Sequence, residues 1–527
     1  MYDDQTMLMT PKSALENFFS AFRRNVIGNQ QTFESPFGEK EIIYADWTAS
    51  GRAYRPIEER IQKEIMPFVA NTHTETTITG TLMSKAYAKA KIIVKHHVHA
   101  NKDDVFVFCG SGMTSAVNKL QRILGLRVPE RMGDYMKKGG AQLDEVLKPI
   151  VFVTHMEHYS NHITWLETIA DVELIGSGEN GNVDLECFRN LLEQFKHRKN
   201  IIAAITACSN VTGIQTPYHE IAKMVHQYGG LCFVDFACSA PYIDINMHPR
   251  EKDTHLDAIY FSPHKFLGGP GTSGVLIFNK RIYKSTIPDQ PGGGTILYSN
   301  PWKVHEYITD IEQREDGGTP PFLQGIKVAM CVRLKEEMGV ENILKREEEI
   351  LHIIFERFSK MKNVEIFEGN IKKRLGVISF IVNGAHHNLI AKILNDRFGV
   401  QTRGGCSCAG TYGHMLLHVD ETRSYEILNS IHSGDLLCKP GWIRLSVHPI
   451  MTNAEIDFIM DAIELTASHF QEWMKDYRYD RGSGEYSFKG AEAKEHCKIE
   501  DWFNLSGWDK PLALRQNTRV DNRLTSV

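Results

Sequence analysis

The sequence predicts an α/β protein with a mostly parallel central sheet, helices on both faces of that sheet, and a smaller α+β region toward the C-terminus. The first observation is that short segments rich in Val, Ile and Phe alternate with helical segments through the middle of the chain. Such segments are typical of strands buried on both faces of a parallel sheet. The second is a Gly/Pro-rich stretch at about 292–321, after which a long helical segment and a second, smaller set of strands follow.

Each predicted strand of the central sheet is short and mostly apolar. The seven candidates are Val105–Phe108, Ile150–Thr154, Val172–Ile175, Ile201–Thr206, Leu231–Phe236, Ala258–Ser262 and Val275–Phe278. Helices are predicted between them at Thr114–Leu124, Leu185–Phe195 and Tyr218–Tyr228. This alternation gives a parallel sheet with helices on both faces, and ligands gather at the carboxyl ends of its strands.

The last third of the chain predicts a different arrangement. A helical stretch from Phe322 to about Lys360, broken at Gly339, precedes strands at Gly376–Val382 and Trp442–Val447, a helix at Asn388–Phe398, and a last helix opened by the capping box Thr452–Glu455. We therefore expect four parts. They are an N-terminal helical segment (1–43), a large domain (44–320), a small domain (321–476) to which the N-terminal segment contributes residues, and an extension (477–527) without clear periodicity.

Composition excludes several classes of protein. The 527 residues are 42% hydrophobic and 24% charged, as in soluble globular proteins. The net charge of -5 argues against a nucleic-acid binder that works by bulk charge. No apolar run approaches the ~18 residues of a membrane span, and the N-terminus lacks the pattern of a secretory signal. The ten cysteines lie mostly in apolar strand-like contexts, which favours reduced thiols and a cytoplasmic location.

Lys265 is the strongest local signal, because it follows a buried strand and precedes a Gly-rich turn. A lysine is rarely buried unless it is paired or used, and a desolvated one can form a Schiff base with a carbonyl cofactor. Asp235 ends an earlier strand, where it can pair with a protonated pyridine nitrogen. Taken singly, Lys265 also fits a solvated strand end, and Asp235 a helix cap or a metal ligand.

Residues 110–114 (Gly-Ser-Gly-Met-Thr) follow a predicted strand and open a helix. Free backbone N–H groups at such a helix start suit a phosphate. The spacing is not that of a P-loop, and a purely structural turn is the alternative.

These motifs, in this order, resemble the class V aminotransferase group of pyridoxal phosphate enzymes, and within it the cysteine desulfurases and selenocysteine lyases. The likeness runs from about Tyr44 to Ser468. It includes the opening segment 44–50, the segment 156–161 and the segment 209–213. The resemblance implies the three-layer fold type I, pyridoxal 5'-phosphate as cofactor, an amino acid substrate and a homodimer.

The resemblance also implies a role for each matching residue. Lys265 matches the Schiff-base lysine, Asp235 the partner of the ring nitrogen, and His158 the histidine that stacks on the ring and shuttles a proton. The phosphate is expected to contact Gly112, Met113, Thr114, Ser262 and His264, and also Thr295, whose loop crosses a dimer interface in the family. Asn210 matches a residue that contacts cofactor or substrate.

Substrate recognition is expected from Arg444, which matches the arginine that binds the α-carboxylate, with Arg403 and His73 beside it. An interdomain salt bridge is the alternative for Arg444, and a loop histidine for His73. One position departs from the family pattern, because Cys238 stands where the desulfurases usually carry a Gln that hydrogen-bonds the cofactor. A thiol is a weak donor, so this puts the reaction type in doubt more than cofactor binding.

Residues 402–410 form a Gly-rich loop that contains Cys406 and Cys408. Nearby positive charge favours the reactive thiolate, and Arg403 supplies it. In the desulfurases this region carries the cysteine that holds sulfur as a persulfide, and alignment places that nucleophile at Cys408. The pair could instead pass sulfur between thiols or form a regulatory disulfide. A zinc site with His414 and His418, or a loop without chemistry, are further alternatives; we predict no metal.

The sequence therefore predicts a cysteine desulfurase that takes sulfur from L-cysteine onto Cys408, releases L-alanine and passes the sulfur to an acceptor protein. A first alternative is another aminotransferase, lyase or epimerase of the same class without a catalytic cysteine. A second is a non-catalytic member that binds a metal or a protein partner.

Overall fold

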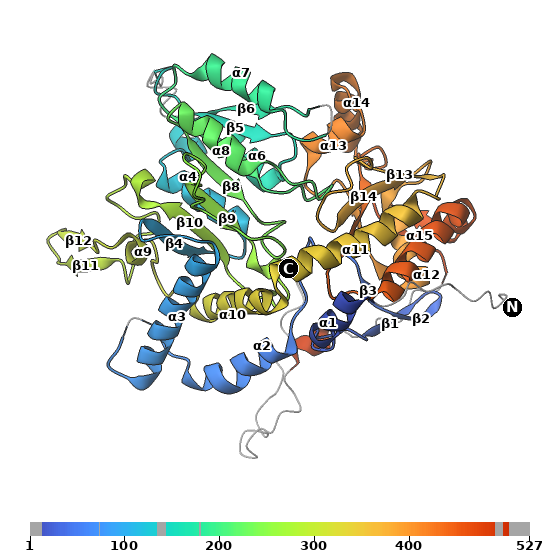
Figure 1. Cartoon of the computed structure of the whole chain (residues 1–527), viewed down its shortest axis with the longest axis horizontal. Helices are drawn as coiled ribbons and strands as arrows, with labels where there is room; N and C mark the ends of the chain where they lie inside the picture. The colour runs from blue at the N-terminus through green and yellow to red at the C-terminus, as the bar shows by residue number, and fades with distance from the viewer. Residues whose placement is uncertain (1–12, 73, 134–143, 179–180, 491–498, 505–527) are drawn as a thin grey trace, which may run out of the picture.

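The computed structural model of the chain describes residues 13–72, 74–133, 144–178, 181–490 and 499–504. Its central feature is a seven-stranded sheet (Figure 1). The strand order is β4-β10-β9-β8-β7-β5-β6. The bounds are β4 Asp104–Cys109, β5 Ile150–Thr154, β6 Asp171–Ile175, β7 Ile201–Thr206, β8 Leu231–Asp235, β9 Ala258–Phe261 and β10 Gly274–Asn279. Only β10 runs antiparallel to its neighbours in this sheet. All seven predicted strands are confirmed, each to within one residue at either end.

The sheet is covered on both faces because its side chains alternate between two cores. In β4, Val105 and Val107 belong to one buried cluster, together with residues of α4 (Met113–Ile123). Phe106 and Phe108 belong to the other, which includes residues of α7 (Leu185–Phe195) and α8 (Tyr218–Gln227). Successive side chains of a strand point to opposite faces, so the predicted three layers are confirmed.

A second sheet lies in the C-terminal part of the chain, drawn in yellow and orange at the right of Figure 1. Its order is β13-β14-β17-β16, and all of its pairs are antiparallel. The bounds are β13 Val364–Ile366, β14 Val377–Val382, β16 Arg403–Gly405 and β17 Trp442–Ser446. The helices around it are α10 Phe322–Met338, α11 Val340–Phe358, α12 His387–Phe398 and α15 Asn453–Trp473. The predicted break at Gly339 and the capping box at Thr452 are both present.

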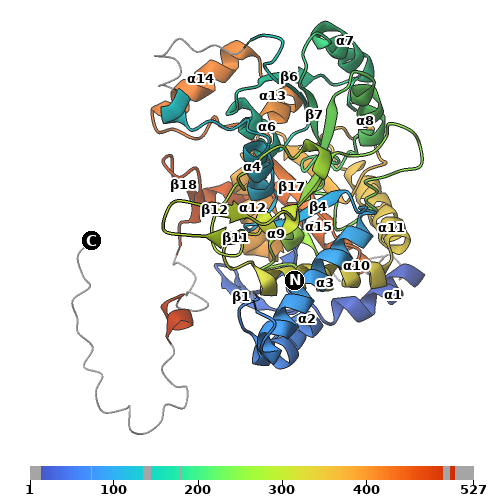
Figure 2. The same cartoon turned by 90° about the vertical axis from the view of Figure 1, so that its left-hand side faces the viewer.

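The N-terminal segment packs mainly on this C-terminal region. Helix α1 (Ala14–Arg23) contacts α11, and β3 (Ile43–Tyr44) pairs in parallel with β15 (Val400–Gln401). Figures 1 and 2 both show α1 beside α11, away from the central sheet. The chain then crosses to the central sheet, where Gly51 N donates to His264 O over 2.9 Å. The boundaries at 43, 320 and 476 remain predictions.

Most of the remaining elements are shorter, and α3 is the exception with 20 residues. The helices are α2 Arg55–Arg60, α3 Ile78–His97, α6 Tyr159–Leu166, α9 Ile311–Arg314, α13 Gly410–Leu416 and α14 Glu421–His432; the strands are β1 Thr32–Ser35, β2 Gly38–Glu41, β11 Ile296–Ser299, β12 His305–Tyr307, β18 Tyr477–Tyr479 and β19 Tyr486–Phe488. Sequence periodicity did not indicate the hairpin β18–β19. Its strands are three residues long, and tertiary contacts support them, such as Phe488 against Phe37 at 5.2 Å between ring centroids.

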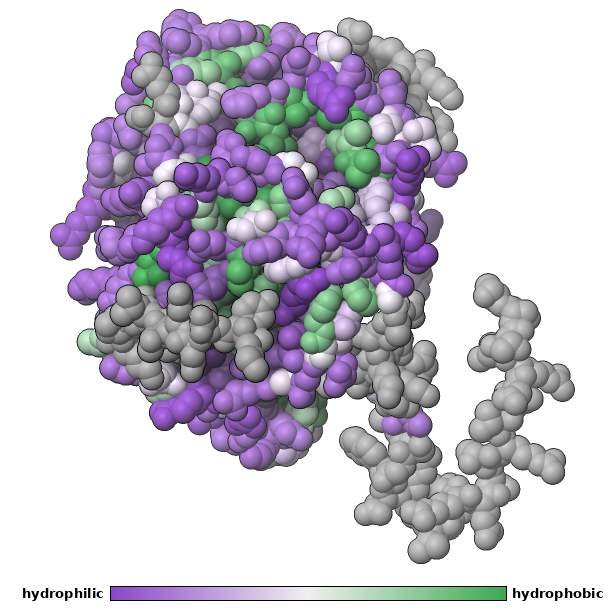
Figure 3. Space-filling model, turned by 90° about the vertical axis from the view of Figure 1, so that its right-hand side faces the viewer, coloured by the Kyte–Doolittle hydropathy of each residue, from purple (hydrophilic) through white to green (hydrophobic). Residues whose placement is uncertain are grey.

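The surface gives no sign of a membrane span. In the part of the chain that the structure describes, every helix is too short or too polar to cross a bilayer. The face drawn in Figure 3 is largely hydrophilic, with hydrophobic side chains in patches between polar ones, as is usual for protein surfaces.

We expect Leu120→Ala in α4 to lower the free energy of unfolding by about 2–5 kcal/mol, because Leu120 is 0% exposed and its loss leaves a cavity against the sheet. Leu465→Ala in α15 is the matched control, since Leu465 is 44% exposed; its effect should be about 0.5 kcal/mol or less. Urea unfolding of both variants measures the difference, and equal effects would contradict the packing of α4.

Candidate active site

A cavity of about 200 Å³ opens at the carboxyl edge of the central sheet. It collects side chains that follow β4, β5, β7, β8 and β9, together with two from the second sheet. Of the residues singled out in the sequence, those that line it are Met113, Thr114, His158, Asn210, Asp235, Cys238, Ser262, His264, Lys265, Arg403 and Arg444. This convergence follows from the parallel topology, which places the carboxyl ends of neighbouring strands at one edge.

Lys265 lies at the end of a short turn, Pro263–Lys265, directly after β9. Its backbone N–H donates to the carbonyl of Ser262 over 3.1 Å, which fixes the turn. Burial lowers the pKa of Lys265, while Cys238 and Asp235 act in the opposite direction. A lysine in such surroundings holds its proton less tightly and is a better nucleophile and base.

Asp235 is the last residue of β8 and is almost fully buried. Burial raises its pKa from 3.8 to about 6, opposed by the N–H of Ala237, which donates to Asp235 Oδ1 over 2.8 Å, and by Lys265. A buried carboxylate with a single hydrogen bond from the protein favours a cationic partner. The site therefore offers a place for a protonated nitrogen at this edge of the sheet.

His158 is held as the N-cap of α6, where its Nδ1 accepts the backbone N–H of Ser160 over 3.1 Å. Burial lowers its pKa to about 3, and the charge of Lys265 adds to this effect. The imidazole is therefore neutral at physiological pH. Since Nδ1 accepts, the proton of the neutral ring lies on Nε2. Burial also lowers the pKa of His264 to about 4.

The start of α4 forms a cradle of donors. Met113 N donates to Ser262 Oγ over 2.8 Å, and Thr114 Oγ1 lies 2.7 Å from Ser160 Oγ. A Cβ at Gly112 would lie 2.9 Å from Ser262 Oγ, so glycine permits this close approach. Helix N-termini with adjacent hydroxyls suit phosphate.

Arg403 and Arg444 come from the second sheet, where β16 and β17 place them directly opposite each other. Arg444 is 3% exposed and Arg403 46%. Arg444 donates to Asn210 O over 3.3 Å, and both arginines pair with Asp46, a residue that sequence reasoning did not select. The guanidinium groups of Arg403 and Arg444 therefore line part of the cavity with positive charge, and we call this pair the cationic, or two-arginine, wall.

Cys238, at the expected Gln position, lines the cavity beside Cys208. The two thiols share one acceptor, Ser209 O, at 3.7 and 3.6 Å. A hydrogen bond with Cys208 lowers the pKa of Cys238, whereas burial opposes it and Lys265 assists. The Cys238 thiol, a weak donor, therefore already donates its hydrogen bond to a backbone carbonyl of the protein, Ser209 O.

The cysteine loop presents a different residue to the cavity from the one expected. Ser407 lines the cavity and is buried, whereas Cys408 is exposed and Cys406 half-buried. Asn210 Nδ2 donates to Ser407 O over 2.7 Å, and Tyr159 N donates to Cys408 O over 2.7 Å. Ser407 and Cys408 both have left-handed backbones, with φ of 49° and 56°. These contacts hold the loop in a strained conformation.

Among the described residues, Gly112 and Thr295 were expected at the cofactor but do not line this cavity. Thr295 is fully buried in its own turn, and its hydroxyl donates to Gly292 O over 2.7 Å. His73 lies outside the described residues. Sequence reasoning missed Thr48, Ser160, Thr206, Cys208 and Ser407, which also line the cavity. These residues gave no signal, because small polar residues are common in loops and at the ends of strands and helices.

Four polar atoms of residues that line the cavity are buried and have no hydrogen-bond partner among the described residues. They are Thr48 Oγ1, Asn210 Oδ1, Ser407 Oγ and Arg444 Nε. Buried polar groups are normally paired. Other such atoms lie elsewhere in the described chain, and these four are available to a polar ligand in the cavity.

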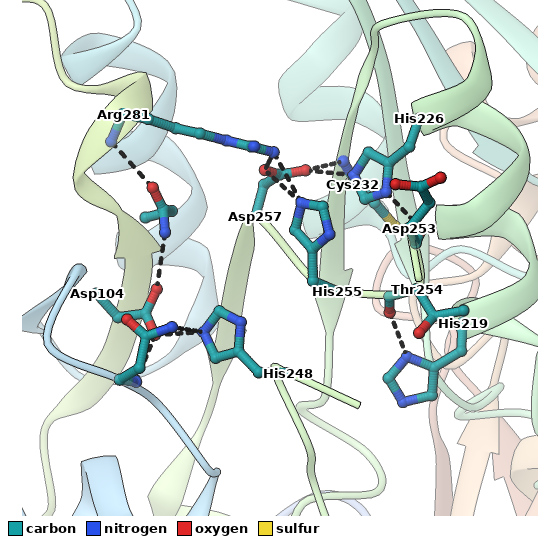
Figure 4. A network of polar contacts seen from close by, with 12 residues as sticks. Asp104, His219, His226, Cys232, His248, Asp253, Thr254, His255, Asp257 and Arg281 are labelled. Carbon is teal, nitrogen blue, oxygen red and sulfur yellow. Dashed lines mark hydrogen bonds and ion pairs between the residues drawn. The ribbon is translucent and has the colours of Figure 1, made fainter. Parts of the chain in front are cut away.

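The alternative zinc site in the cysteine loop is not assembled. His414 bonds Gly410 O through Nδ1 (2.8 Å) and Ser424 Oγ through Nε2 (2.9 Å). Among the described residues, His226, His255 and Asp257 are the group that comes closest to a metal site (Figure 4). There Arg281 already pairs with both His255 and Asp257, so the protein's own cation occupies the cluster.

We expect Asp235→Asn to stabilise the ligand-free protein above about pH 6. Because the folded pKa lies above the unfolded one, Asp235 contributes stability in its protonated form below about pH 4, and this is lost as the pH rises through about 6. The variant should therefore gain about 3 kcal/mol over the wild type near pH 8 and little near pH 4. Urea unfolding at both pH values measures this; a difference that does not change with pH would contradict the burial of the charge.

Comparison with known proteins agrees with the expected family and fold. The family model for aminotransferase class-V matches residues 43–459. A probable cysteine desulfurase of Halalkalibacterium halodurans is 26% identical over 376 residues, which is 70% of this chain and 84% of that protein. A cysteine desulfurase of Haloferax volcanii is 25% identical over 401 residues, covering 75% and 88%.

Solved structures show the same fold. The apo cysteine desulfurase of Thermococcus onnurineus NA1 superposes with a TM-score of 0.67 at 22% identity, over 85% of this chain and 98% of that one. A cysteine desulfurase of Escherichia coli gives a TM-score of 0.65 at 17% identity, over 86% and 98%. Since the family model spans most of the chain and the expected fold is present, the chain belongs to the class-V aminotransferase family of enzymes.

Proposed function

We propose that the protein is a pyridoxal phosphate-dependent cysteine desulfurase that converts L-cysteine to L-alanine and holds the sulfur on Cys408. The observation that carries the proposal is the convergence of Lys265, Asp235 and His158 on one cavity, with an exposed thiol on the adjoining loop. The relatives named cysteine desulfurase support it.

The residues of the cavity fit pyridoxal phosphate. Lys265 Nζ would bind its aldehyde carbon, Asp235 its ring nitrogen, and the donors at the start of α4 with Ser262 its phosphate. When bound, the cofactor supplies a ring that delocalises the electron pair left at an amino acid's α-carbon. The orphaned hydroxyls and amide around the cavity give further hydrogen-bonding partners.

The remaining steps belong to residues of this chain. Arg444 binds the substrate carboxylate, for which its unpaired Nε–H is available. Lys265, whose pKa burial lowers, takes the proton from the α-carbon. His158, neutral with its proton on Nε2, would pack against the cofactor ring and exchange a proton with the substrate.

The sulfur transfer needs no outside oxidant. The Cys408 thiolate attacks the substrate sulfur, so that an S–S bond forms and the substrate's Cβ–S bond breaks. Protonation at Cβ leaves L-alanine, and Cys408 carries the persulfide. Cys408 is exposed, which suits later delivery to an acceptor protein. Cys406, whose Sγ lies 4.0 Å from Tyr159 Oη, is the alternative thiol.

A second candidate function is another reaction of the same family, such as an aminotransferase, lyase or epimerase reaction, without a catalytic cysteine. Two observations favour it. Ser407 rather than Cys408 of the cysteine loop lines the cavity, and Cys238 replaces the expected Gln. A non-catalytic role fits less well, because burial shifts the pKa values of Lys265, Asp235 and His158, as is typical of catalytic groups.

We also propose a cytoplasmic homodimer. The hairpin β11–β12, which follows Thr295 directly, exposes Leu297, Trp302 and Val304. Clustered exposed apolar side chains favour a protein interface. A partner subunit would cover them and bring the 293–295 loop near the second cavity.

We expect Lys265→Ala to abolish the visible absorption band of the purified protein, because the cofactor then lacks its covalent attachment. Lys223→Ala, a half-exposed surface lysine paired with Glu251, is the control and should keep the band. Persistence of the band in Lys265→Ala would overturn the lysine assignment.

We expect Cys408→Ser to lower sulfide release from L-cysteine at least a hundredfold, with alanine falling equally, because the sulfur loses its acceptor. Cys406→Ser identifies the alternative thiol. Cys438→Ser removes another exposed thiol and should leave the rate unchanged. Sulfide and alanine are assayed in the same reaction; if neither loop variant lowers sulfide release, the desulfurase proposal fails.

A further inference from the structure

Two arginines face each other across neighbouring strands of the second sheet. Arg403 of β16 pairs in register with Arg444 of β17. Side chains directly opposite in an antiparallel pair lie within a few ångströms of each other, and like charges there are destabilising. Arg444 is also buried, so water cannot screen its charge effectively. The arrangement needs a counter-ion.

Asp46 supplies that counter-ion from a distant part of the chain. Its Oδ1 lies 2.6 Å from the Arg444 guanidinium and its Oδ2 lies 3.2 Å from Arg403 Nε. The Asp46 side chain is 14% exposed. The backbone of Asp46 forms a bridge with Ser446 at the end of β17, which fixes the carboxylate against both arginines.

Asp46 touches the arginines from outside the cavity. Both arginines line the cavity, whereas Asp46 does not. Arg444 lines the cavity, and its Nε–H has no hydrogen-bond partner in the described chain, so it remains available to an anion. Asp46 therefore neutralises one of two positive charges without occupying the space of a ligand.

The three side chains carry one net positive charge, since two guanidinium groups face a single carboxylate. One ligand carboxylate neutralises this wall. A ligand with a second anionic group would bury an unpaired negative charge, which is costly. Without Asp46 the wall would carry two positive charges and could pair with both.

We propose that Asp46 determines substrate specificity by setting the two-arginine wall to a single positive charge. The site then accepts amino acids with one carboxylate and an uncharged side chain, and it discriminates against acidic amino acids. The inference rests on the proposed function only in that an amino acid is the ligand. A purely positioning role for Asp46 is the competing interpretation, and the two differ in what they predict for charge.

The test uses holoenzyme and two ligands of nearly the same shape, L-asparagine and L-aspartate. Binding is measured by calorimetry and by the change in the visible absorption band. Wild type should bind asparagine at least tenfold more tightly than aspartate. In Asp46→Asn this preference should shrink at least tenfold, mainly through tighter aspartate binding. Asp46→Glu keeps the charge and should keep the preference. Asp103→Asn removes one negative charge from a surface pair with Lys280 and should have no effect.

Several outcomes would overturn the proposal. If Asp46→Asn weakens both ligands equally, Asp46 only positions the arginines. If wild type binds aspartate as tightly as asparagine, or binds neither, the charge argument is wrong. Should Asp46→Asn fail to fold, the preference is measured instead in an Asp46→Ala,Arg403→Gln double variant, which also carries one positive charge; a preference kept there supports the proposal, and a lost one overturns it. None of these readouts depends on sulfide release, so failure of the desulfurase proposal remains distinguishable.

Discussion

Burial at the carboxyl edge of the seven-stranded sheet decides which charges the active site can hold. It raises the pKa of Asp235 to about 6 and lowers those of Lys265 and His158. A buried carboxylate and a buried ammonium are each unfavourable when they lack partners. The apolar side chains buried on both faces of the sheet offset this cost. The groups at its edge therefore keep protonation states suited to proton transfer.

The segment 44–51 joins the two sheets into one site. Its first residues lie along β15 and β17, where Asp46 pairs with Arg444. Its last residue, Gly51, meets the Lys265 turn so closely that a Cβ would lie 1.9 Å from Phe266 O. Only glycine allows this approach. The cationic wall and the reactive lysine are therefore held at a fixed spacing by one short piece of chain.

Features that depend on a local sequence pattern could be predicted, whereas contacts that depend on the register of paired strands could not. All seven central strands are apolar runs bounded by turns, and the ends of two of those strands make Asp235 and Lys265 candidates, whose roles rest on the family resemblance. The pairing of Arg403 opposite Arg444, and the arrival of Asp46 between them, follow from the β16–β17 register and the β3–β15 pairing. Neither has a local signal. Ser407 rather than Cys408 lines the cavity, and this depends on the left-handed backbone of both residues. The sequence gives no signal for that backbone conformation.

The strained loop that carries Ser407 and Cys408 would take part in both steps of the proposed sulfur transfer, formation of the persulfide and its delivery. A persulfide must form inside the cavity, near the substrate, yet its sulfur must leave to a partner outside. Left-handed backbone at Ser407 and Cys408 costs on the order of 1–3 kcal/mol each, and the anchors from Asn210 and Tyr159 offset it. Asn210 anchors the loop through Ser407 O and also lines the cavity. A ligand that takes over the Asn210 amide would remove one of the two contacts that offset the strain, so the position of the loop and the occupancy of the cavity depend on the same side chain.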